Sequence, residues 1–279
     1  MPLKRLGEHL TLLECPLPED YGMVQAVLVS GTCRRVLVDT LCSPADVAPF
    51  MEDRVDLVIY THGDWDHCWG TAAFLGVPVI GHALTRRRMQ EPTEAALLEQ
   101  FQAKHPDRFA GARIIPPVIA FTGELEVDAG GVTLRLEHVP GHTADSIWVY
   151  LPELEVLLAG DAAEDPFPSL GVPGSLRDWA RQLRRRAAAG VRQVVPAHGR
   201  VMGPQLLVRN ADYIEWLLAE AEQGLARGLD LVAIQEALSL ERFFGHKADR
   251  WAGYYRTAHR ENVAAAVAEV RQNTGPRTR

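Results

Sequence analysis

The chain of 279 residues is predicted to fold as a mixed α and β protein. Short apolar runs of strand length recur through residues 1–203, and most of them stop at Gly, Pro or Asp. Stretches with apolar residues at helical spacing lie between these runs, and after Gly203 only helical patterns remain. These three observations predict a layered α/β (α+β) domain with a C-terminal helical appendage.

The expected elements follow one another with a turn residue or a helix breaker at most boundaries. Strands are expected at residues 10–14, 23–30, 34–39, 56–60, 77–80, 113–120, 125–128, 132–139, 146–151, 155–159 and 191–195. Helices are expected at residues 44–52, 68–75, 83–105, 175–189, 205–225, 231–238 and 249–270. A proline-containing loop is expected at 164–174, beside Asp161, as a candidate wall of a pocket. We therefore divide the chain into an α/β domain (1–203), a helical appendage (204–273) and a disordered tail (274–279).

Composition excludes several classes of function. The net charge of -7 disfavours nucleic acid, because binding a phosphate backbone requires a basic surface. The basic runs at 86–88 and 184–186 lie on predicted helices, where a solvated helix face explains them. No apolar run reaches the length of a membrane span, and the first residues lack a signal-peptide core. Four cysteines without CxxC spacing suit the reducing cytoplasm. We expect a cytoplasmic protein that acts on a small molecule, without nucleic-acid or membrane partners.

The segment after the apolar run 56–60 is the most informative part of the sequence. It places His62, Asp64, Asp66 and His67 within six residues, directly after a predicted buried strand. Alternate residues of an extended segment face the same side, so several of these side chains point to one spot. Imidazole together with carboxylate suits zinc, iron or manganese. A solvated polar turn is the alternative interpretation of this segment alone.

Further along the chain the same arrangement recurs. Three more candidate ligands each follow an apolar run: His142 after 134–139, Asp161 after 154–159 and His198 after 191–195. Open α/β sheets collect their chemistry at the ends of strands, so the four loops are expected to converge. This repetition makes a metal site a better interpretation than a set of unrelated polar turns.

In order and in spacing, these motifs resemble those of the metallo-β-lactamase-fold superfamily. The matching segments are His62-x-Asp64-x-Asp66-His67, Gly141-His142-Thr143, Gly160-Asp161, Pro196-Ala197-His198-Gly199 and the strand end Val38-Asp39-Thr40. The resemblance spans residues 10–205 and implies a four-layer αββα sandwich that binds two divalent metal ions. Zinc is the preferred ion, with iron or manganese as alternatives. The implied ligands are His62, Asp64 and His142 for metal one and Asp66, His67 and His198 for metal two, with Asp161 bridging.

One position departs from the family pattern His-x-His-x-Asp-His, because Asp64 stands where the second histidine is expected. Flavo-diiron proteins of the same fold resemble this chain in carrying a carboxylate there. An anionic ligand shifts the preference toward harder ions such as iron or manganese. Aspartate is also shorter than histidine. If Asp64 does not reach the metal, a single-metal site results, and the sequence leaves both arrangements open.

The resemblance implies a metal-dependent hydrolase. Two divalent ions lower the pKa of a bound water and polarise a carbonyl or phosphoryl oxygen. The expected substrate is an ester-like bond of a small molecule, such as a thioester, a lactone or a phosphoester. Asp66 is the expected catalytic residue, which orients the nucleophile and passes its proton to the leaving group. The context of Trp65-Asp66-His67 resembles glyoxalase II-type thioesterases. The alternatives are an iron-dependent oxidoreductase, resembling a sulfur dioxygenase, and a binding protein with a degenerate site.

Other residues with metal-binding or aromatic side chains are given supporting roles. Cys68 is expected to be a small buried residue. His138 is expected either to pack in the interior or to contact a ligand from behind. Trp65 is expected either to line the substrate pocket or to shield the metals from solvent. His82 is expected to lie near the site without being one of its ligands. His105, His246 and His259 are expected at the surface. The helical appendage is expected either to cap the active site, to form a homodimer contact, or to extend the core.

Overall fold

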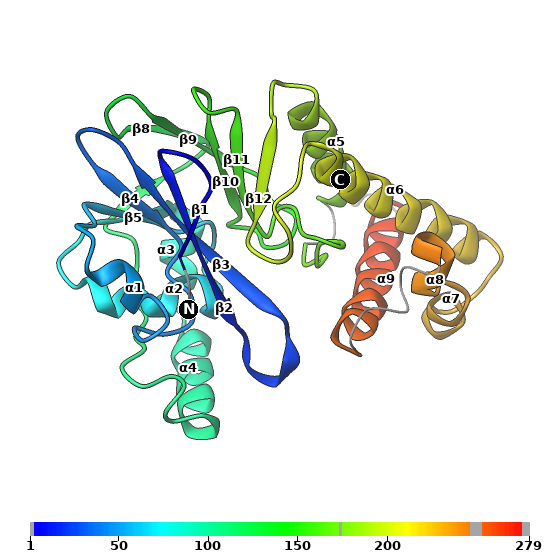
Figure 1. The fold of residues 1–279 in the computed structure, drawn as a ribbon. Coiled ribbons are helices and arrows are strands. Elements are labelled where there is room, and N and C mark those ends of the chain that lie inside the picture. Colours follow the sequence, from blue (N-terminus) through cyan, green and yellow to red (C-terminus); the bar gives the residue numbers. More distant parts are fainter. Residues whose placement is uncertain (1–2, 173–174, 246–252, 275–279) are drawn as a thin grey trace.

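The computed structural model describes residues 3–172, 175–245 and 253–274. Two β-sheets face each other at its centre (Figure 1). The first sheet has the order β1-β2-β3-β4-β5-β6-β7 and comprises Leu3–Arg5, Leu10–Pro16, Met23–Ser30, Arg35–Val38, Leu57–Ile59, Val79–His82 and Ile119–Phe121. The second sheet has the order β12-β11-β10-β9-β8 and comprises Gln193–Pro196, Val156–Gly160, Ile147–Leu151, Thr133–His138 and Glu124–Asp128.

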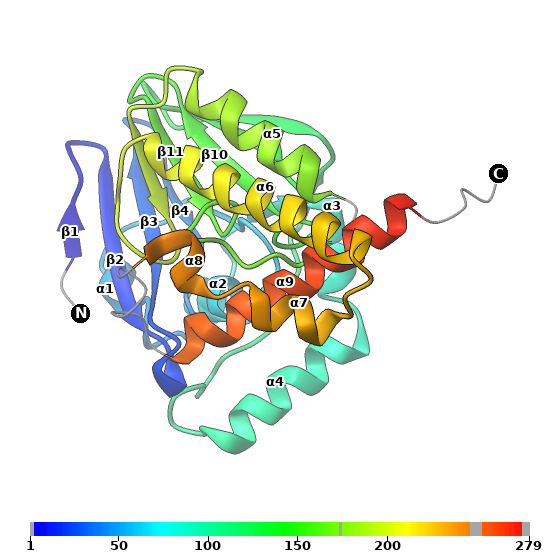
Figure 2. The same cartoon turned by 90° about the vertical axis from the view of Figure 1, so that its right-hand side faces the viewer.

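Helices cover the outer face of each sheet (Figures 1 and 2). The first sheet is covered by α1 (Ala48–Met51), α2 (Trp65–Cys68), the short 3-10 helix Trp69–Phe74, α3 (Ala83–Arg88) and α4 (Pro92–Lys104). The second is covered by α5 (Leu176–Ala187) and α6 (Gln205–Ala226), and α9 (Gly253–Thr274) packs against α6, with α7 (Leu231–Ala237) and α8 (Leu240–Phe244) beside it. The predicted four-layer αββα sandwich is thereby confirmed. None of the helices within the described residues has the length and apolar character needed to cross a membrane.

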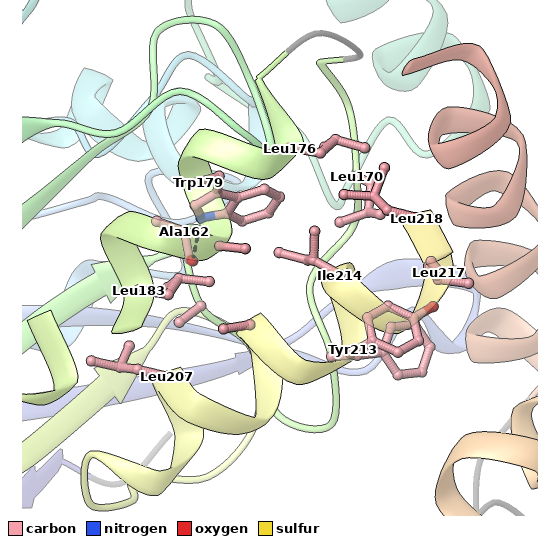
Figure 3. Packing of buried hydrophobic residues seen from close by; sticks show 14 of the residues in the cluster. Ala162, Leu170, Leu176, Trp179, Leu183, Leu207, Tyr213, Ile214, Leu217 and Leu218 are labelled. Carbon is pink, nitrogen blue, oxygen red and sulfur yellow. Dashed lines mark hydrogen bonds between the residues drawn. The ribbon is translucent and has the colours of Figure 1, made fainter. Parts of the chain in front are cut away.

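Three apolar clusters hold the layers together. One lies between the two sheets and includes Val29 and Ile59 from the first sheet and Leu136 and Leu158 from the second. A second joins the first sheet to its helices. The third joins the second sheet to α5, α6 and α9, and Figure 3 shows its packing around Trp179. Two helices of the predicted appendage, α6 and α9, therefore share one core with the second sheet. Burial of such side chains is the main favourable term in folding.

Most predicted elements are present, but several boundaries are wrong. The helix predicted at 83–105 is two helices, because Pro92 cannot donate a hydrogen bond and favours an extended residue before it. The strand predicted at 113–120 shrinks to β7, since Pro116 and Pro117 lack the N–H group that a sheet ladder needs. The helix predicted at 68–75 is a 3-10 helix that follows α2. The strand β1 and the helix α8 were not predicted.

Of the predicted tail at 274–279, Thr274 is the last residue of α9, and the other residues lie outside the described part of the chain. The division of the chain at residue 203 stays a prediction.

Candidate metal centre

The structure brings all seven predicted ligands to one edge of the sandwich. His62 and Asp64 lie in the loop after β5, Asp66 and His67 lie on α2, and His142, Asp161 and His198 follow β9, β11 and β12. The strands β11 and β12 are parallel, and β9 runs in the same direction because two antiparallel pairings separate it from β11. The carboxyl ends of these strands therefore share one edge of the second sheet, facing the loop after β5.

The first group of ligand atoms consists of His62, Asp64 and His142. Asp64 Oδ2 lies 3.3 Å from His62 Nε2 and 3.1 Å from His142 Nε2. The shorter side chain of Asp64 therefore reaches the two imidazoles. In a tetrahedral zinc site with bonds of about 2.0–2.1 Å, neighbouring ligand atoms are about 3.3 Å apart. The separations in this group match that spacing.

The second group consists of Asp66, His67 and His198. Asp66 Oδ2 lies 3.4 Å from His198 Nε2, and Asp66 Oδ1 lies 3.8 Å from His67 Nε2. Asp161 stands between the two groups. Its Oδ1 is 3.4 Å from His67, and its Oδ2 is 3.4 Å from His198, 3.5 Å from His142 and 3.7 Å from His62. A carboxylate in this position can contribute one oxygen to each group.

Three atoms of this cluster are buried without a hydrogen-bond partner: His62 Nε2, His67 Nε2 and Asp161 Oδ1. Buried polar atoms are nearly always paired, so three neighbouring exceptions require an explanation. All three residues belong to groups whose ligand atoms lie close enough together to hold a metal ion. The donor set of imidazole nitrogens and carboxylate oxygens therefore fits divalent zinc, iron or manganese.

The other ring nitrogen of every histidine in the cluster has a partner. Nδ1 of His67 donates to Asp39 Oδ2 at 2.9 Å, and Nδ1 of His62 lies 3.1 Å from the hydroxyl of Thr61. Asp39 also accepts hydrogen bonds from the backbone N–H and the hydroxyl of Thr61. Such contacts fix the ring orientation and leave Nε2 free to bind a metal.

The remaining two imidazoles are held by backbone carbonyls. Nδ1 of His142 donates to Ser169 O at 3.1 Å, and Nδ1 of His198 donates to Met23 O at 2.9 Å. Met23 opens β3 of the first sheet, whereas His198 follows β12 of the second. The two sheets thus contribute jointly to the orientation of the ligands.

Two glycines allow the ligand loops to approach their neighbours. A Cβ atom on Gly141 would lie 2.1 Å from the ring of Trp179, so the loop of His142 can pack on this indole only through glycine. Gly160 has φ +52, and a Cβ atom there would lie 2.7 Å from Cβ of Thr61. Glycine adopts this left-handed conformation without steric cost. Both residues belong to the motifs that the sequence analysis identified.

Carboxylates surround the imidazoles of the centre and favour the protonated form of His142 and His198. Burial alone lowers the pKa of His142, but the hydrogen bond with Asp64 and the charge of Asp161 outweigh it and raise this pKa to about 10. Burial likewise opposes a raised pKa at His198, yet the charge of Asp161 and the hydrogen bond with it raise the pKa to about 9. In the metal-free protein, protons therefore occupy imidazoles that a metal ion would bind.

We expect metal binding at pH 7 to release at least two protons, because His142, His198 and His67, whose pKa is also raised, must become neutral to bind a metal. Since the pKa values of His142 and His198 lie above 7, the apparent metal affinity should rise as the pH increases from 6 to 8. Isothermal titration calorimetry of the metal-free protein with Zn²⁺, in buffers of different ionisation enthalpy, measures the number of protons. A binding enthalpy that does not depend on the buffer would contradict this expectation.

A cavity of about 220 Å³ opens onto the ligands. Its walls include four aromatic side chains from distant parts of the chain: Tyr21, Trp65, Phe101 and Tyr254. Trp65, for which the sequence left two roles open, thus lines the pocket. Tyr254 belongs to α9, so this helix forms part of the cavity wall in addition to its place in the core.

Glu164 also lines this cavity, together with Ser169 of the same loop, so the loop predicted at 164–174 contributes to the pocket wall through these two residues. Glu164 is buried, and one of its oxygens lies within 4.8 Å of the ligand atoms of His142 and Asp161. Burial and the charge of Asp161 raise the pKa of Glu164 to about 7. The sequence analysis did not identify Glu164 as a candidate ligand, and its position three residues after Asp161 was the one local signal.

Two other interpretations need correction. His259, predicted at the surface, is buried between the hydroxyl of Tyr213 and Leu238 O, because α9 packs into the outer helix layer. Arg88, assigned to a solvated helix face, forms an ion pair with Asp64 at 2.6 Å. Cys68 is buried, as predicted.

The other histidines of the described residues are not members of the ligand groups. His138 stacks on His82 with ring centroids 4.0 Å apart, so it is packed, as predicted. His105 pairs with Glu19 in a partly exposed position. His246 lies outside the described residues.

The two-sheet sandwich with a histidine–aspartate cluster at one edge defines a class of metal-binding α/β proteins. The chain belongs to the metallo-beta-lactamase superfamily, whose family profile matches residues 20–198. The predicted branch within the superfamily, the glyoxalase II-like one, is not resolved by this match and stays a prediction.

Two solved structures illustrate the likeness. A metallo-beta-lactamase family protein from Thermus thermophilus is 22% identical, with 96% of this chain and 95% of that chain covered and a TM-score of 0.70. A metallo-beta-lactamase from Pontibacter korlensis is 21% identical, with 77% of this chain and 98% of that one covered and a TM-score of 0.58. At such identities the likeness shows the fold alone.

Among curated proteins, the chain is similar to the lactamase-like protein vrtG of Penicillium aethiopicum. The two are 29% identical over 149 residues, which is 53% of this chain and 40% of that relative. The match therefore spans less than half the length of the relative.

Proposed function

We propose that the protein is a metal-dependent hydrolase that cleaves an ester-like bond of a small molecule, namely a thioester, a lactone or a phosphoester. The observation that carries this proposal is the convergence of two ligand groups, linked by Asp161, at the cavity. Two divalent ions, preferably zinc, would be held by these groups and would lower the pKa of a water and polarise the oxygen under attack.

Asp66 is the residue to which we assign proton transfer. It is 7% exposed and lines the cavity, with Oδ2 directed toward His198 and Oδ1 toward His67. From this position its carboxylate can accept a hydrogen bond from the attacking water and deliver the proton to the leaving group. The aromatic walls exclude water and offer an apolar surface to the rest of the substrate.

The size of the cavity favours a small substrate or one end of a longer one. Its volume of about 220 Å³ is below the range of roughly 300–1,000 Å³ that is typical of ligand pockets. We place the activity in the cytoplasm, because three of the four cysteines are buried as free thiols and the fourth, Cys33, is exposed and free. We also propose that two copies of the chain form a homodimer through the helical appendage.

One observation favours a second function. Asp64 occupies the position of a ligand to metal one, and a carboxylate at this position suits iron better than a third imidazole does. An iron-dependent oxidoreductase on the same fold is therefore the alternative.

Metal content and reaction type separate the two functions. We expect the protein, purified without chelators or added metal, to contain about two equivalents of zinc or manganese per chain and to hydrolyse members of a panel of p-nitrophenyl esters, acyl thioesters, lactones and phosphoesters. One equivalent of iron with oxygen uptake and no hydrolysis would favour the oxidoreductase. A protein that takes up no metal, even after reconstitution, would contradict both functions.

A further inference from the structure

The two oxygens of Asp64 have different neighbours. Oδ2 faces the imidazoles of His62 and His142, at 3.3 Å and 3.1 Å. Oδ1 is turned away from the imidazoles and lies 2.6 Å from Nη1 of Arg88 on α3. One carboxylate thus joins a metal-ligand group on one side to a guanidinium on the other.

Arg88 is itself held in place by further carboxylates. Its Nε lies 2.8 Å from Oε1 of Glu94, which is buried at the start of α4, and its Nη1 lies 3.7 Å from Oδ1 of Asp145. Asp145 is buried and also accepts hydrogen bonds from the backbone N–H of Gly63 and the hydroxyl of Thr85. The loop that carries Asp64 is therefore tied to α3 by side chains on both sides of Arg88.

This arrangement has two physical consequences. A guanidinium with hydrogen-bond partners on several sides cannot follow a carboxylate that rotates, so it fixes the orientation of Asp64. Its single positive charge is shared among Asp64, Glu94 and Asp145, so it offsets the negative charge of Asp64 only in part.

We propose that Arg88 is a positioning residue for metal one: it pairs with Oδ1 of Asp64 and fixes the carboxylate that stands where the family pattern has its second histidine. This role rests on the proposed metal centre. Glu94 holds the guanidinium, Oδ1 of Asp64 is occupied by the ion pair, and Oδ2 is left as a single oxygen ligand.

The test is a titration of the metal-free, full-length protein with Zn²⁺ in competition with a chromophoric chelator. The wild type should bind two equivalents. Arg88→Gln should weaken one equivalent by about 10–100-fold, the usual effect of losing a group that orients a metal ligand, and should leave the other unchanged. The d–d absorption of Co²⁺ should change for the same single equivalent.

Controls separate positioning from folding. Arg87→Gln removes an exposed arginine from the same helix and should bind both equivalents like the wild type. Because Arg88→Gln leaves the buried Glu94 without its guanidinium, the double variant Arg88→Gln/Glu94→Gln provides a neutral pair if the single variant does not fold. Arg88→Lys keeps the charge without the planar fork and should restore only part of the affinity.

The outcomes distinguish this inference from the proposed function. Weakening of one equivalent with an altered Co²⁺ spectrum supports the role of Arg88. If the wild type binds two equivalents and the Arg88 variants bind both as tightly, or lose both equally, the inference is overturned and the hydrolase stands. If the wild type binds no metal, the inference and the proposed function both fail.

Discussion

Replacement of Asp161 by asparagine is expected to reduce kcat/KM by about 10³-fold or more, because metal ions contribute several kcal/mol of transition-state stabilisation and each 1.36 kcal/mol is a factor of ten. Among the described residues, Asp161 is the one carboxylate that lies within 4 Å of all four imidazoles of the cluster, and its Oδ1 is buried without a hydrogen-bond partner. Asparagine has nearly the same shape, but it lacks the negative charge that holds two cations together.

The measurement combines steady-state hydrolysis of the best ester found in the substrate panel with metal analysis per chain. We expect Asp161→Asn to lose at least one of two equivalents while its circular dichroism spectrum stays unchanged. Asp165→Asn is a suitable control, because Asp165 is also buried but pairs with Arg200 and Arg209. Two tightly bound equivalents and a wild-type rate in Asp161→Asn would show that this carboxylate does not bridge the centre.

Replacement of Trp179 by alanine is expected to lower the free energy of unfolding by about 3–5 kcal/mol, the usual cost of removing a buried aromatic side chain. Trp179 is fully buried on α5, and its ring packs directly against Gly141. Its Nε1 donates a hydrogen bond to Ala162 O at 3.0 Å, as Figure 3 shows. The indole therefore supports the loop of His142 and the loop of Asp161 at once, so metal affinity should fall together with stability.

Urea unfolding of the metal-free protein measures the free energy without a contribution from bound metal. Trp179→Phe keeps most of the ring volume and loses one hydrogen bond, so it should cost substantially less than alanine. A loss below about 1 kcal/mol in Trp179→Ala, well under the usual cost, would mean that the two loops are held in place by other contacts.

The sequence was informative about the ligands because their signals are local. Each of the seven residues stands within a few positions of the end of an apolar run, and these strands end at the same edge of the sandwich. Because strands that run in the same direction end at the same edge, and because their connections are right-handed, the loops that follow them can lie in few other places. The fold class could be predicted for the same reason, since strand and helix periodicities are properties of short segments.

The boundaries of elements were less predictable. Helical periodicity continues through Pro92 and apolar residues continue through Pro116 and Pro117, yet Pro92 is the first residue of a new helix, α4, and β7 begins only after Pro117. The burial of His259 could not be seen in the sequence of α9 alone, because it depends on α6 and Leu238 lying against that helix.

By itself, the sequence determined a mixed α and β fold and the set of side chains with metal-binding chemistry, and the αββα architecture followed from its resemblance to a known family. Only the tertiary structure decided how Asp64 is paired, that Glu164 faces the ligands, and that Tyr254 of α9 forms part of the cavity wall. The physical reason is sequence distance. Arg88 reaches Asp64 from the end of α3, and Tyr254 reaches the cavity from α9, the last of the described helices. Contacts of this kind leave no periodic or local pattern in the sequence, and they arise only when the layers pack.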